Sequence, residues 1–430
     1  MSPSPDTSVL LLGAGGREHA LAWALARSPR LKNLYALSGS DAISDWAQRL
    51  PGNPALPEQI VAAAKDRHVG LVVVGPEAPL AAGVADALRA AGILVFGPNK
   101  NGARLESSKI YAKEFMARHG IPAARSQAFK TSEAAKSALK DWPAPVVVKA
   151  DGLAGGKGVF VCSSRTEAAK AVDFLMEQKG AGPAGENVLL EEVLSGPEIS
   201  ALALCDGKNF RLLPLARDHK RLQDGDAGPN TGGMGAFAPV PVSKEERAAI
   251  ESVFALALGG LRADGIDYRG VLYAGLMMTP QGPRVLEFNC RLGDPEAQAV
   301  LPLLKSDFFE AALACAKGEL GEIRLEAALG ACVCVVLASR GYPQKPEPAG
   351  KISGLEDAAR DRNVLIFHSS TSARERDWSG GAGRVLGVSA LGHDLAEARR
   401  RAYAAADKIK FAGKILRRDV AAGAPVAAEA

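Results

Sequence analysis

The chain has 430 residues, of which 47% are hydrophobic, and its 52 basic and 48 acidic residues leave a formal net charge of +4. This length predicts several domains with large cores, and the balanced charge without a Lys/Arg block disfavours a nucleic-acid-binding protein. The six cysteines show no CxxC pair, which disfavours a zinc site or a disulfide framework. No apolar run is long enough to span a membrane, and the polar first residues do not resemble a signal peptide, so we expect a cytoplasmic protein.

The first hundred residues alternate between apolar runs and helical patterns. The predicted elements are, in chain order, a strand at 9–12, a helix at about 18–26, a strand at 70–74, a helix at about 80–91 and a strand at 93–96. This alternation predicts an open, doubly wound parallel sheet in a domain of residues 1–105. Ligands of such sheets bind beyond the carboxyl ends of the strands, so segments 13–18 and 75–79 should share one rim.

After about residue 105 the pattern becomes α+β. The next predicted elements are a helix at 108–119, strands at 146–150 and 159–162, a helix at about 166–178 and a strand at 188–192. We assign residues 106–329 to this second region. A third, mixed region at 330–420 opens with an apolar run and ends in a helix at 393–409, and residues 421–430 are predicted to form a loose tail. The fold class is therefore a multidomain combination of α/β and α+β.

The first glycine-rich loop, GAGGREHA at 13–20, follows a strand and opens a helix, as a dinucleotide-binding loop would. The third glycine of that fingerprint is replaced by Glu18, and no acidic residue closes the second strand at 35–37, so an NAD site is disfavoured. Unpaired N–H groups at the helix start, with Gly15 and Gly16 allowing close approach, favour an anion such as a phosphate. A plain strand-to-helix turn remains the alternative.

The second loop, KADGLAGGKGV at 149–159, resembles a P-loop only in composition. Lys157 takes the place of the required glycine, and Gly158 that of the Ser or Thr that would hold Mg²⁺. Because VVVK precedes the loop and VFVC follows it, we predict a hairpin tip between two strands. A glycine tip that carries Gly155, Gly156 and Lys157 can fold over a triphosphate. In a bare hairpin these glycines would cost chain entropy, which favours a functional loop.

A hairpin at 270–296 carries a row of polar residues on its second arm. The side-chain period of two places Glu287, Asn289 and Arg291 on one face. Carboxylate and amide oxygens suit a Mg²⁺ ion that bridges nucleotide phosphates, and an arginine beyond them can hold a carboxylate. An ordinary polar strand face is the alternative.

Together these segments resemble the ATP-grasp superfamily, and the full set resembles its phosphoribosylamine–glycine ligase family. The matching strings run from residue 13 to nearly 390: GGREHA, GPEAPL, SKIYAKEFM, KADGLAGGKGV, EEVLSGPE, DHKR, DGDAGPNTGGMGA, LEFNCRLGDPE and AGRVLGV. The resemblance implies an ATP-grasp fold at 106–329 with a lid subdomain at about 124–196. It also implies ATP as a substrate, with Mg²⁺ or Mn²⁺.

The resemblance further implies a role for each matching residue. Glu192 and Leu194 would meet adenine through their backbones, and Glu198 would accept the ribose hydroxyls. The implied ATP-binding set is Lys109, Lys149, Gly155, Gly156, Lys157, Glu192, Leu194 and Glu198. The implied metal ligands are Glu287 and Asn289, and the implied catalytic residues are Lys157, Arg291 and Asp294. The implied substrate-binding set is Gly15, Gly16, Glu77, Asp218, Lys220, Arg291 and Asp294.

The implied reaction activates glycine as glycyl phosphate with ATP and joins it to 5-phosphoribosylamine in purine synthesis. The alternatives are another ATP-grasp carboxylate–amine ligase, or a nucleotide-binding homologue without turnover. The implied partners are small molecules only, with no nucleic acid and no membrane, for a monomer or small homo-oligomer.

Two segments depart from the family pattern. SGSDAIS at 38–44 replaces a PGNAG-like loop, and residues 273–277 offer no acidic metal ligand on the strand before Glu287.

Overall fold

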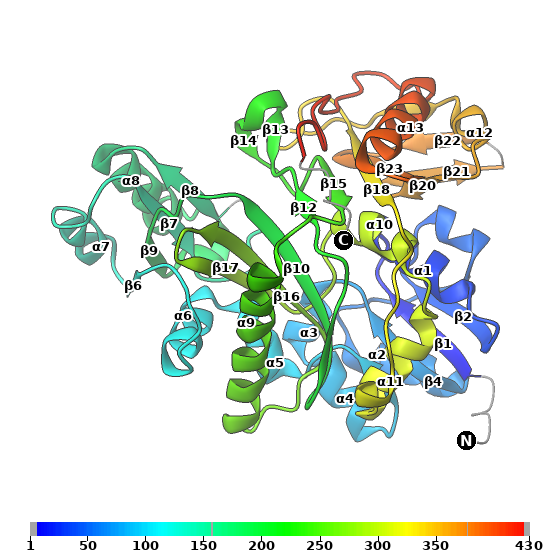
Figure 1. Ribbon diagram of the computed structural model, residues 1–430, viewed down its shortest axis with the longest axis horizontal. Helices are drawn as coiled ribbons and strands as arrows, with labels where there is room; N and C mark the ends of the chain where they lie inside the picture. Colours follow the sequence, from blue (N-terminus) through cyan, green and yellow to red (C-terminus); the bar gives the residue numbers. More distant parts are fainter. Residues whose placement is uncertain (1–6, 156–157, 376, 425–430) are drawn as a thin grey trace.

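The computed structural model describes residues 7–155, 158–375 and 377–424 of the chain (Figure 1). Its first sheet consists of β1 (Thr7–Leu12), β2 (Leu31–Leu37), β3 (Gln48–Leu50), β4 (Val69–Val74) and β5 (Leu94–Phe96). The strand order is β3-β2-β1-β4-β5, and every pair is parallel. The helices that connect these strands are α1 (Gly16–Ala26), α2 (Pro57–Asp66), α3 (Glu77–Ala82) and α4 (Val84–Ala90). The predicted doubly wound sheet is thus confirmed, with its order reversing between β1 and β4.

Two local predictions for this region need correction. The single helix expected at 80–91 is wrong, because Gly83 adopts φ +92° and separates α3 from α4. The sequence pattern predicts no helix or strand between β2 and β4, but this segment contains a 3-10 helix, η1 (Asp41–Asp45), and the short strand β3. Three-residue strands and 3-10 turns leave no periodic signal in a sequence.

Two antiparallel sheets follow. The smaller sheet has the order β6 (Ser126–Phe129), β9 (Val188–Glu192), β7 (Val146–Ala150) and β8 (Val159–Cys162), with α7 (Ser132–Ala138) and α8 (Arg165–Val172) beside it. The larger sheet has the order β11 (Phe210–Leu212), β10 (Glu198–Asp206), β16 (Arg269–Thr279) and β17 (Gly282–Asn289). Near these two sheets lie α5 (Lys100–Ser107), α6 (Lys109–Arg118) and α9 (Lys244–Ala263) (Figure 1). The helix predicted at 166–178 ends at Val172, where a π-helical turn takes over.

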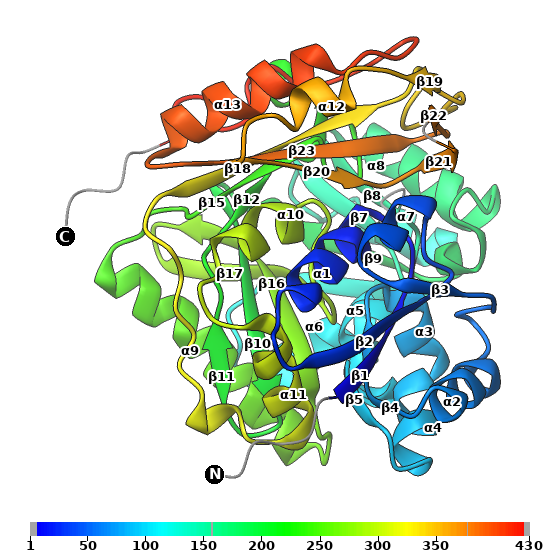
Figure 2. The ribbon, with the colours of Figure 1, turned by 90° about the vertical axis from the view of Figure 1, so that its right-hand side faces the viewer.

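The last large sheet joins strands from distant parts of the chain. Its antiparallel order is β12 (Arg217–Asp218), β15 (Gly235–Ala238), β18 (Ala331–Ala338), β23 (Arg384–Gly392) and β20 (Val364–His368). α13 (Leu395–Lys408) covers its outer face, whereas α10 (Glu296–Val300) and α1 lie between it and the first sheet (Figure 2). Two strands that precede residue 330 therefore complete the C-terminal sheet.

Smaller elements and buried side chains complete the fold. The sheet β19 (Gly350–Ile352), β22 (Asp377–Gly380) and β21 (Thr371–Arg374) flanks β20, and β13 (Arg221–Gln223) pairs with β14 (Ala227–Asn230). Further helices are α11 (Phe308–Lys317) and α12 (Leu355–Ala358). All six cysteines are free and buried. Ala421 is also buried, so the packed chain reaches into the segment predicted as a tail. Within the described ranges, no helix is long and apolar enough to cross a membrane.

We expect Gly83→Ala to lower the free energy of unfolding by about 1 kcal/mol, because an L-residue is strained at this left-handed backbone position. Gly259 lies inside α9 with open space where a Cβ would stand, so Gly259→Ala should raise the free energy of unfolding by about 0.5 kcal/mol. Denaturant unfolding of the two variants measures both changes. A loss of stability in both would contradict the assignment.

Candidate active site

The glycine-rich loop after β1 meets the loop after β4 where the strand order reverses. The Gly75 N–H donates to Leu12 O at 3.2 Å. The Glu18 side chain passes between the two loops: a Cβ at Gly13 would lie 2.7 Å from its Cγ, and one at Gly75 only 2.3 Å from its Oε1. These glycines therefore make room for a side chain of the protein itself. This explains physically why the dinucleotide fingerprint fails at Glu18.

The helix start at Gly15 to Arg17 is less open than we expected from the sequence. The Gly15 N–H donates to Glu18 Oε2 at 2.7 Å, and the Arg17 N–H points at Asp294 Oδ2 at 3.4 Å. A Cβ at Gly16 would meet Ser369 Oγ at 2.4 Å. The expectation of unpaired N–H groups is therefore wrong for Gly15 and Arg17, because carboxylates of the same chain already supply the negative charge that a helix start favours.

A pair of buried histidines joins this helix to the C-terminal sheet. His19 Nε2 lies 3.2 Å from Ala42 O, and its Nδ1 accepts a hydrogen bond from the His368 N–H at 3.2 Å. This pattern requires the neutral ring with its proton on Nε2. Burial lowers the pKa of His19 to about 4 and that of His368 to about 3.

The divergent SGSDAIS segment takes part in the same contact. Asp41 forms an ion pair with Arg49, and its Oδ2 accepts a hydrogen bond from the Ala373 N–H of β21 at 2.9 Å. Ser38 adopts φ +63° and donates to Gly52 O at 2.8 Å. The segment thus connects the first sheet to the C-terminal region.

Arg291 lies just beyond β17 and is held by two carboxylates from the N-terminal region. Its NH2 is 2.7 Å from Glu106 Oε1, and its Nε is 3.3 Å from Glu77 Oε2. Burial would lower the pKa of Arg291, but Glu106 and Glu77 outweigh it and raise the pKa. Glu106 also accepts a hydrogen bond from the Cys290 N–H, and its side chain is only 7% exposed against 31% for Glu77. Glu77 is therefore the partner of Arg291 that another carboxylate could replace more easily.

Glu287 is the centre of a group of cations. Burial would raise its pKa, but the charges of Lys220, Lys149 and Lys109, and then Arg291, lower the pKa to about 2. The carboxylate is therefore ionised at any physiological pH.

Asn289 lies beside this group, and its Oδ1 is 3.4 Å from Arg291 NH2. The face predicted for Glu287, Asn289 and Arg291 is thus largely confirmed, although a register shift follows Val285 and Arg291 lies beyond the strand end. An ionised carboxylate and an amide oxygen fit a hard cation. In the described ranges no group of three His, Cys, Asp or Glu could hold a metal, so such an ion would also need phosphate or water oxygens.

The predicted hairpin of β7 and β8 is confirmed, with Val146 opposite Cys162 and Lys149 opposite Val159. Lys149 Nζ is 2.9 Å from Glu191 Oε2 and donates to Leu286 O at 3.2 Å, so this ammonium joins the two antiparallel sheets.

At the hairpin tip, Lys109 Nζ donates to Gly152 O at 3.1 Å, while Gly155 is exposed with φ +55°. Gly156 and Lys157 lie outside the described residues.

The segment between β9 and β10 carries the residues expected near adenine and ribose. The Glu192 carboxylate accepts a hydrogen bond from the Arg125 N–H at 2.8 Å. The side chain of Glu192 therefore has a partner within the protein, and the role implied for Glu192 at adenine concerns its backbone only. Leu194 is half-buried. Glu198 forms an ion pair with Lys220, and although burial would lower the pKa of Lys220, Glu198 raises it.

Asp218 lies on β12 of the C-terminal sheet, and Asp294 contacts Arg384 of β23 in the same sheet. Asp294 Oδ1 accepts from Gln298 Nε2 at 2.7 Å and lies 3.3 Å from Arg384 NH1. Burial, and then Glu296, raise the pKa of Asp218 well above its ordinary value. In the part of the chain that the structure describes, Asp218 Oδ1 is buried without a hydrogen-bond partner.

Four charged residues of this site were not predicted: Arg17, Glu106, Glu191 and Arg384. Glu191 forms ion pairs with Lys149 and Lys113, and Arg384 donates to Gly232 O and Asp294 O. Three of the four lie inside family-matching strings, and Glu106 precedes one by two residues. A charged residue next to buried apolar positions in such strings is the signal that could have found them.

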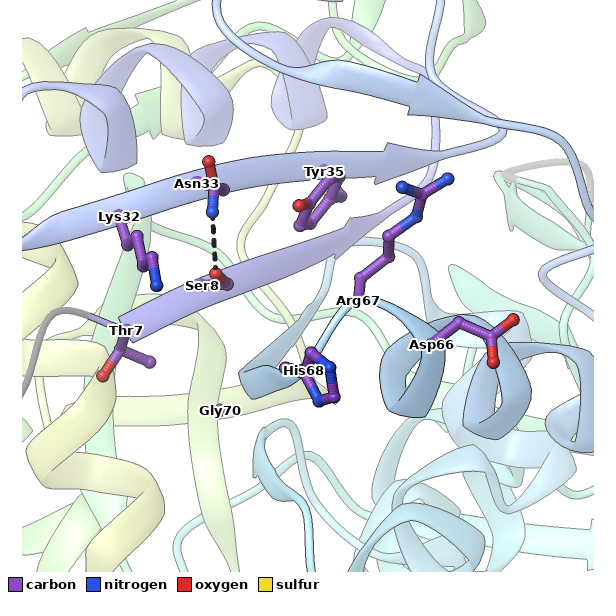
Figure 3. Close-up of a pocket in the computed structure, with 9 residues that line it drawn as sticks. All are labelled: Thr7, Ser8, Lys32, Asn33, Tyr35, Asp66, Arg67, His68 and Gly70. Atoms are coloured by element: carbon purple, nitrogen blue, oxygen red, sulfur yellow. Dashed lines mark hydrogen bonds between the residues drawn. The ribbon is translucent and has the colours of Figure 1, made fainter.

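A cavity of about 370 Å³ lies at the opposite, amino end of the first sheet (Figure 3). It is lined by Thr7, Ser8, Lys32, Asn33, Tyr35, Asp66, Arg67, His68 and Gly70. Because parallel sheets bind ligands beyond the carboxyl ends of their strands, this cavity is not the candidate site.

Lys149 joins the two antiparallel sheets, and the end of β17 carries the carboxylate of Glu287 and the amide of Asn289. This is the architecture of ATP-grasp proteins. The Phosphoribosylglycinamide synthetase, ATP-grasp (A) domain matches residues 107–297. The N domain of the same family matches residues 7–106, and its C domain matches residues 332–423. The chain therefore belongs to the phosphoribosylglycinamide synthetase family, which confirms the resemblance found in the sequence.

Individual relatives agree with this assignment. The chain is 43% identical to a phosphoribosylamine–glycine ligase of Rhodopirellula baltica, over 98% of this chain and 99% of that protein. It is 47% identical to the trifunctional purine biosynthetic protein adenosine-3 of Gallus gallus, over 96% of this chain and 42% of that protein. The crystal structure of a phosphoribosylamine–glycine ligase from Thermotoga maritima is 37% identical, with a TM-score of 0.85 and 96% and 99% of the two chains covered.

The histidine pair predicts acid sensitivity. Unfolded histidines take up a proton near pH 6.5, whereas folded His19 does so only near pH 4, so stability should fall as the pH falls through this window. The slope is about 1.4 kcal/mol per pH unit for each such histidine. His19→Gln should therefore lose less stability than the unmodified protein between pH 7 and pH 5 in denaturant unfolding. Equal losses would contradict the assigned pKa.

Proposed function

We propose that the chain is an ATP-dependent ligase that joins glycine to 5-phosphoribosylamine, giving glycinamide ribonucleotide, ADP and phosphate in purine synthesis. The observation that carries the proposal is the charge environment of Glu287, in which Lys220, Lys149 and Lys109, and then Arg291, lower the pKa of the carboxylate to about 2. Family matches from residue 7 to residue 423 support the same activity, because relatives that are covered almost completely bear its name.

In the first step a carboxylate oxygen of glycine attacks the γ-phosphorus of ATP, and the bond to the β,γ-bridging oxygen breaks to release ADP. We assign Lys109, Lys149 and Lys157 to the phosphates, where their charges oppose the charge of the transferring group. We place the glycine carboxylate at Arg291, where it would take the position that Glu77 occupies in this structure.

In the second step the amine of 5-phosphoribosylamine attacks the acyl carbon of glycyl phosphate, and inorganic phosphate leaves. No covalent bond to the protein is required. We assign Asp294, Gly15, Gly16 and Glu77 to the substrate side. The buried and unpartnered Oδ1 of Asp218 is suited to accept a hydrogen bond from an amine. Closure of the glycine tip would keep water away from the acyl phosphate.

Glu287 and Asn289 are the proposed ligands for Mg²⁺ or Mn²⁺, which would neutralise phosphate charge. We assign adenine to the backbone at Glu192 and Leu194, ribose to Glu198, and phosphate contacts at the tip to Gly155 and Gly156. The proposed ligase region is 106–329, with a lid at about 124–196, between an N-terminal domain of residues 1–105 and a C-terminal domain of 330–420. We further propose a cytoplasmic location and a monomer or small homo-oligomer.

The test is ADP release from the purified protein with ATP, Mg²⁺, glycine and freshly made 5-phosphoribosylamine. We expect full turnover only when both substrates are present. Turnover with bicarbonate or another carboxylate in place of glycine would indicate a different ATP-grasp ligase. Binding of ATP without any ADP release would indicate a homologue without turnover, and either result would reject the proposal.

Glu287→Gln should reduce the rate of ADP release by about 100-fold or more, because the amide keeps the shape but removes the charge that the three lysines surround. Glu326→Gln, at a surface position paired with Arg324, is the control and should keep the unmodified rate. Steady-state kinetics at saturating ATP and Mg²⁺ measures both. Wild-type turnover in Glu287→Gln would remove Glu287 from the mechanism.

A further inference from the structure

Arg417 is the largest of the fully buried side chains in the described part of the chain, and the proposed chemistry does not use it. Its Nε donates to Asp419 Oδ1 at 2.8 Å and its NH2 to Asp419 Oδ2 at 2.6 Å, which is a bidentate pair. Burial would lower the pKa of Arg417, but its hydrogen bonds to Asp419 and Asp226 outweigh burial and raise the pKa. A buried guanidinium with both carboxylate partners in place has little freedom to move. We call the contacts of segment 417–419 with residues 221–226 the Arg417 joint.

The remaining nitrogen of Arg417 reaches the β13–β14 hairpin. NH1 donates to Asp226 Oδ1 at 2.8 Å and to Arg221 O at 3.1 Å. Two backbone groups strengthen the same joint, since the Gly225 N–H donates to Asp419 Oδ2 at 2.8 Å and the Arg418 N–H to Asp224 Oδ1 at 2.7 Å. The segment 417–419 therefore holds the tip of the hairpin from several directions.

The same segment is fixed to the C-terminal region. The Tyr403 hydroxyl on α13 donates to Arg417 O at 2.8 Å and accepts from the Val420 N–H at 3.1 Å. Arg399, on the same helix, donates to Val420 O at 3.0 Å and to Arg418 O at 2.6 Å. Figure 1 shows the hairpin beside this last described part of the chain. The hairpin is thus anchored to α13.

The near end of the hairpin carries Lys220 into the candidate site. The N–H and the Oγ1 of Thr231 both donate to Lys220 O at 2.8 Å, which ties the two arms together where the lysine projects. The Lys220 ammonium pairs with Glu198. The preceding residue is also anchored, because His219 Nε2 accepts from the Ala421 N–H at 3.3 Å.

We propose that Arg417 is a positioning residue for nucleotide binding: it holds the β13–β14 hairpin on the C-terminal region and so keeps Lys220 on Glu198, beside Glu287. This inference rests on the proposed function, in which Glu198 meets the ribose and Glu287 the metal. It explains why a fully buried arginine at a distance from the reacting atoms is paired with two aspartates on different segments.

The test weakens the Arg417 joint on the hairpin side. Asp224 and Asp226 are exposed there, so their substitution leaves the hydrophobic core unchanged. Asp224→Ala/Asp226→Ala removes the bond from the Arg418 N–H and the ion pair with Arg417, whereas Arg417 keeps its pair with Asp419 and its bond to Arg221 O, and the Gly225 N–H keeps its bond to Asp419. The dissociation constant for MgATP is measured by calorimetry on the full chain, and we expect it to rise about fivefold, the effect of losing a charge-assisted contact. Asp361→Ala is the control, because it cuts an ion pair with Arg401 elsewhere in the C-terminal region, and it should leave the constant unchanged.

The same double variant in a Lys220→Met background separates positioning from general loosening. If the joint acts through Lys220, the two aspartate changes have no further effect on MgATP affinity in this background. An unchanged dissociation constant in the first experiment, or the same fivefold rise in the Lys220→Met background, overturns the proposal.

If the Lys220→Met variant binds MgATP too weakly for calorimetry, the comparison in the Lys220→Met background is replaced by hydrogen exchange of the backbone amides of residues 217–223. The proposal requires faster exchange there in Asp224→Ala/Asp226→Ala than in Asp361→Ala, and equal exchange overturns it. All these measurements detect binding or local opening without turnover. They therefore remain decisive even if glycine and 5-phosphoribosylamine fail to stimulate ADP release, which would reject only the proposed reaction.

Discussion

The ionised carboxylate of Glu287 is the charge on which the candidate site depends. Taking a carboxylate out of water is unfavourable unless cations lie near it. For the half-buried Glu287 they come from separate elements: Lys109 from α6, Lys149 from β7 and Lys220 from the segment before β13. The negative charge of Glu287 is therefore compensated only where the two antiparallel sheets, α6 and the β13–β14 hairpin meet. The cations around Glu287 outnumber its single negative charge, and the phosphates of a nucleotide would neutralise the excess of positive charge.

The N-terminal region meets this site through its own carboxylates. Glu18 fills the space between two glycine loops, whereas Glu77 and Glu106 hold Arg291. The glycines at this switch point therefore serve packing within the protein first, because a Cβ would strike the Glu18 side chain. Asp294 adds a further link, since it faces the start of α1 and also Arg384 of the last sheet. The regions are coupled by buried charges and not only by apolar contact.

The C-terminal sheet extends this coupling. β12 and β15 come from the middle of the chain but pair next to β18, so the residues before Lys220 belong to the last sheet. Arg417 holds the other end of the same segment. A segment fixed at both ends has few conformations left, and its lysine needs little ordering when a ligand binds.

Local patterns alone determined the alternating parallel sheet, the hairpin that carries Lys149, and the polar row of Glu287 and Asn289, because strand periods and glycine-rich turns are properties of neighbouring residues. The family strings added the ligase assignment. Tertiary structure alone decided what Arg17, Glu106, Arg384 and Arg417 contact. Each of these depends on a partner brought near by folding, and the charge balance that makes a buried ion tolerable is set by distances in space, which spacing along the chain does not encode.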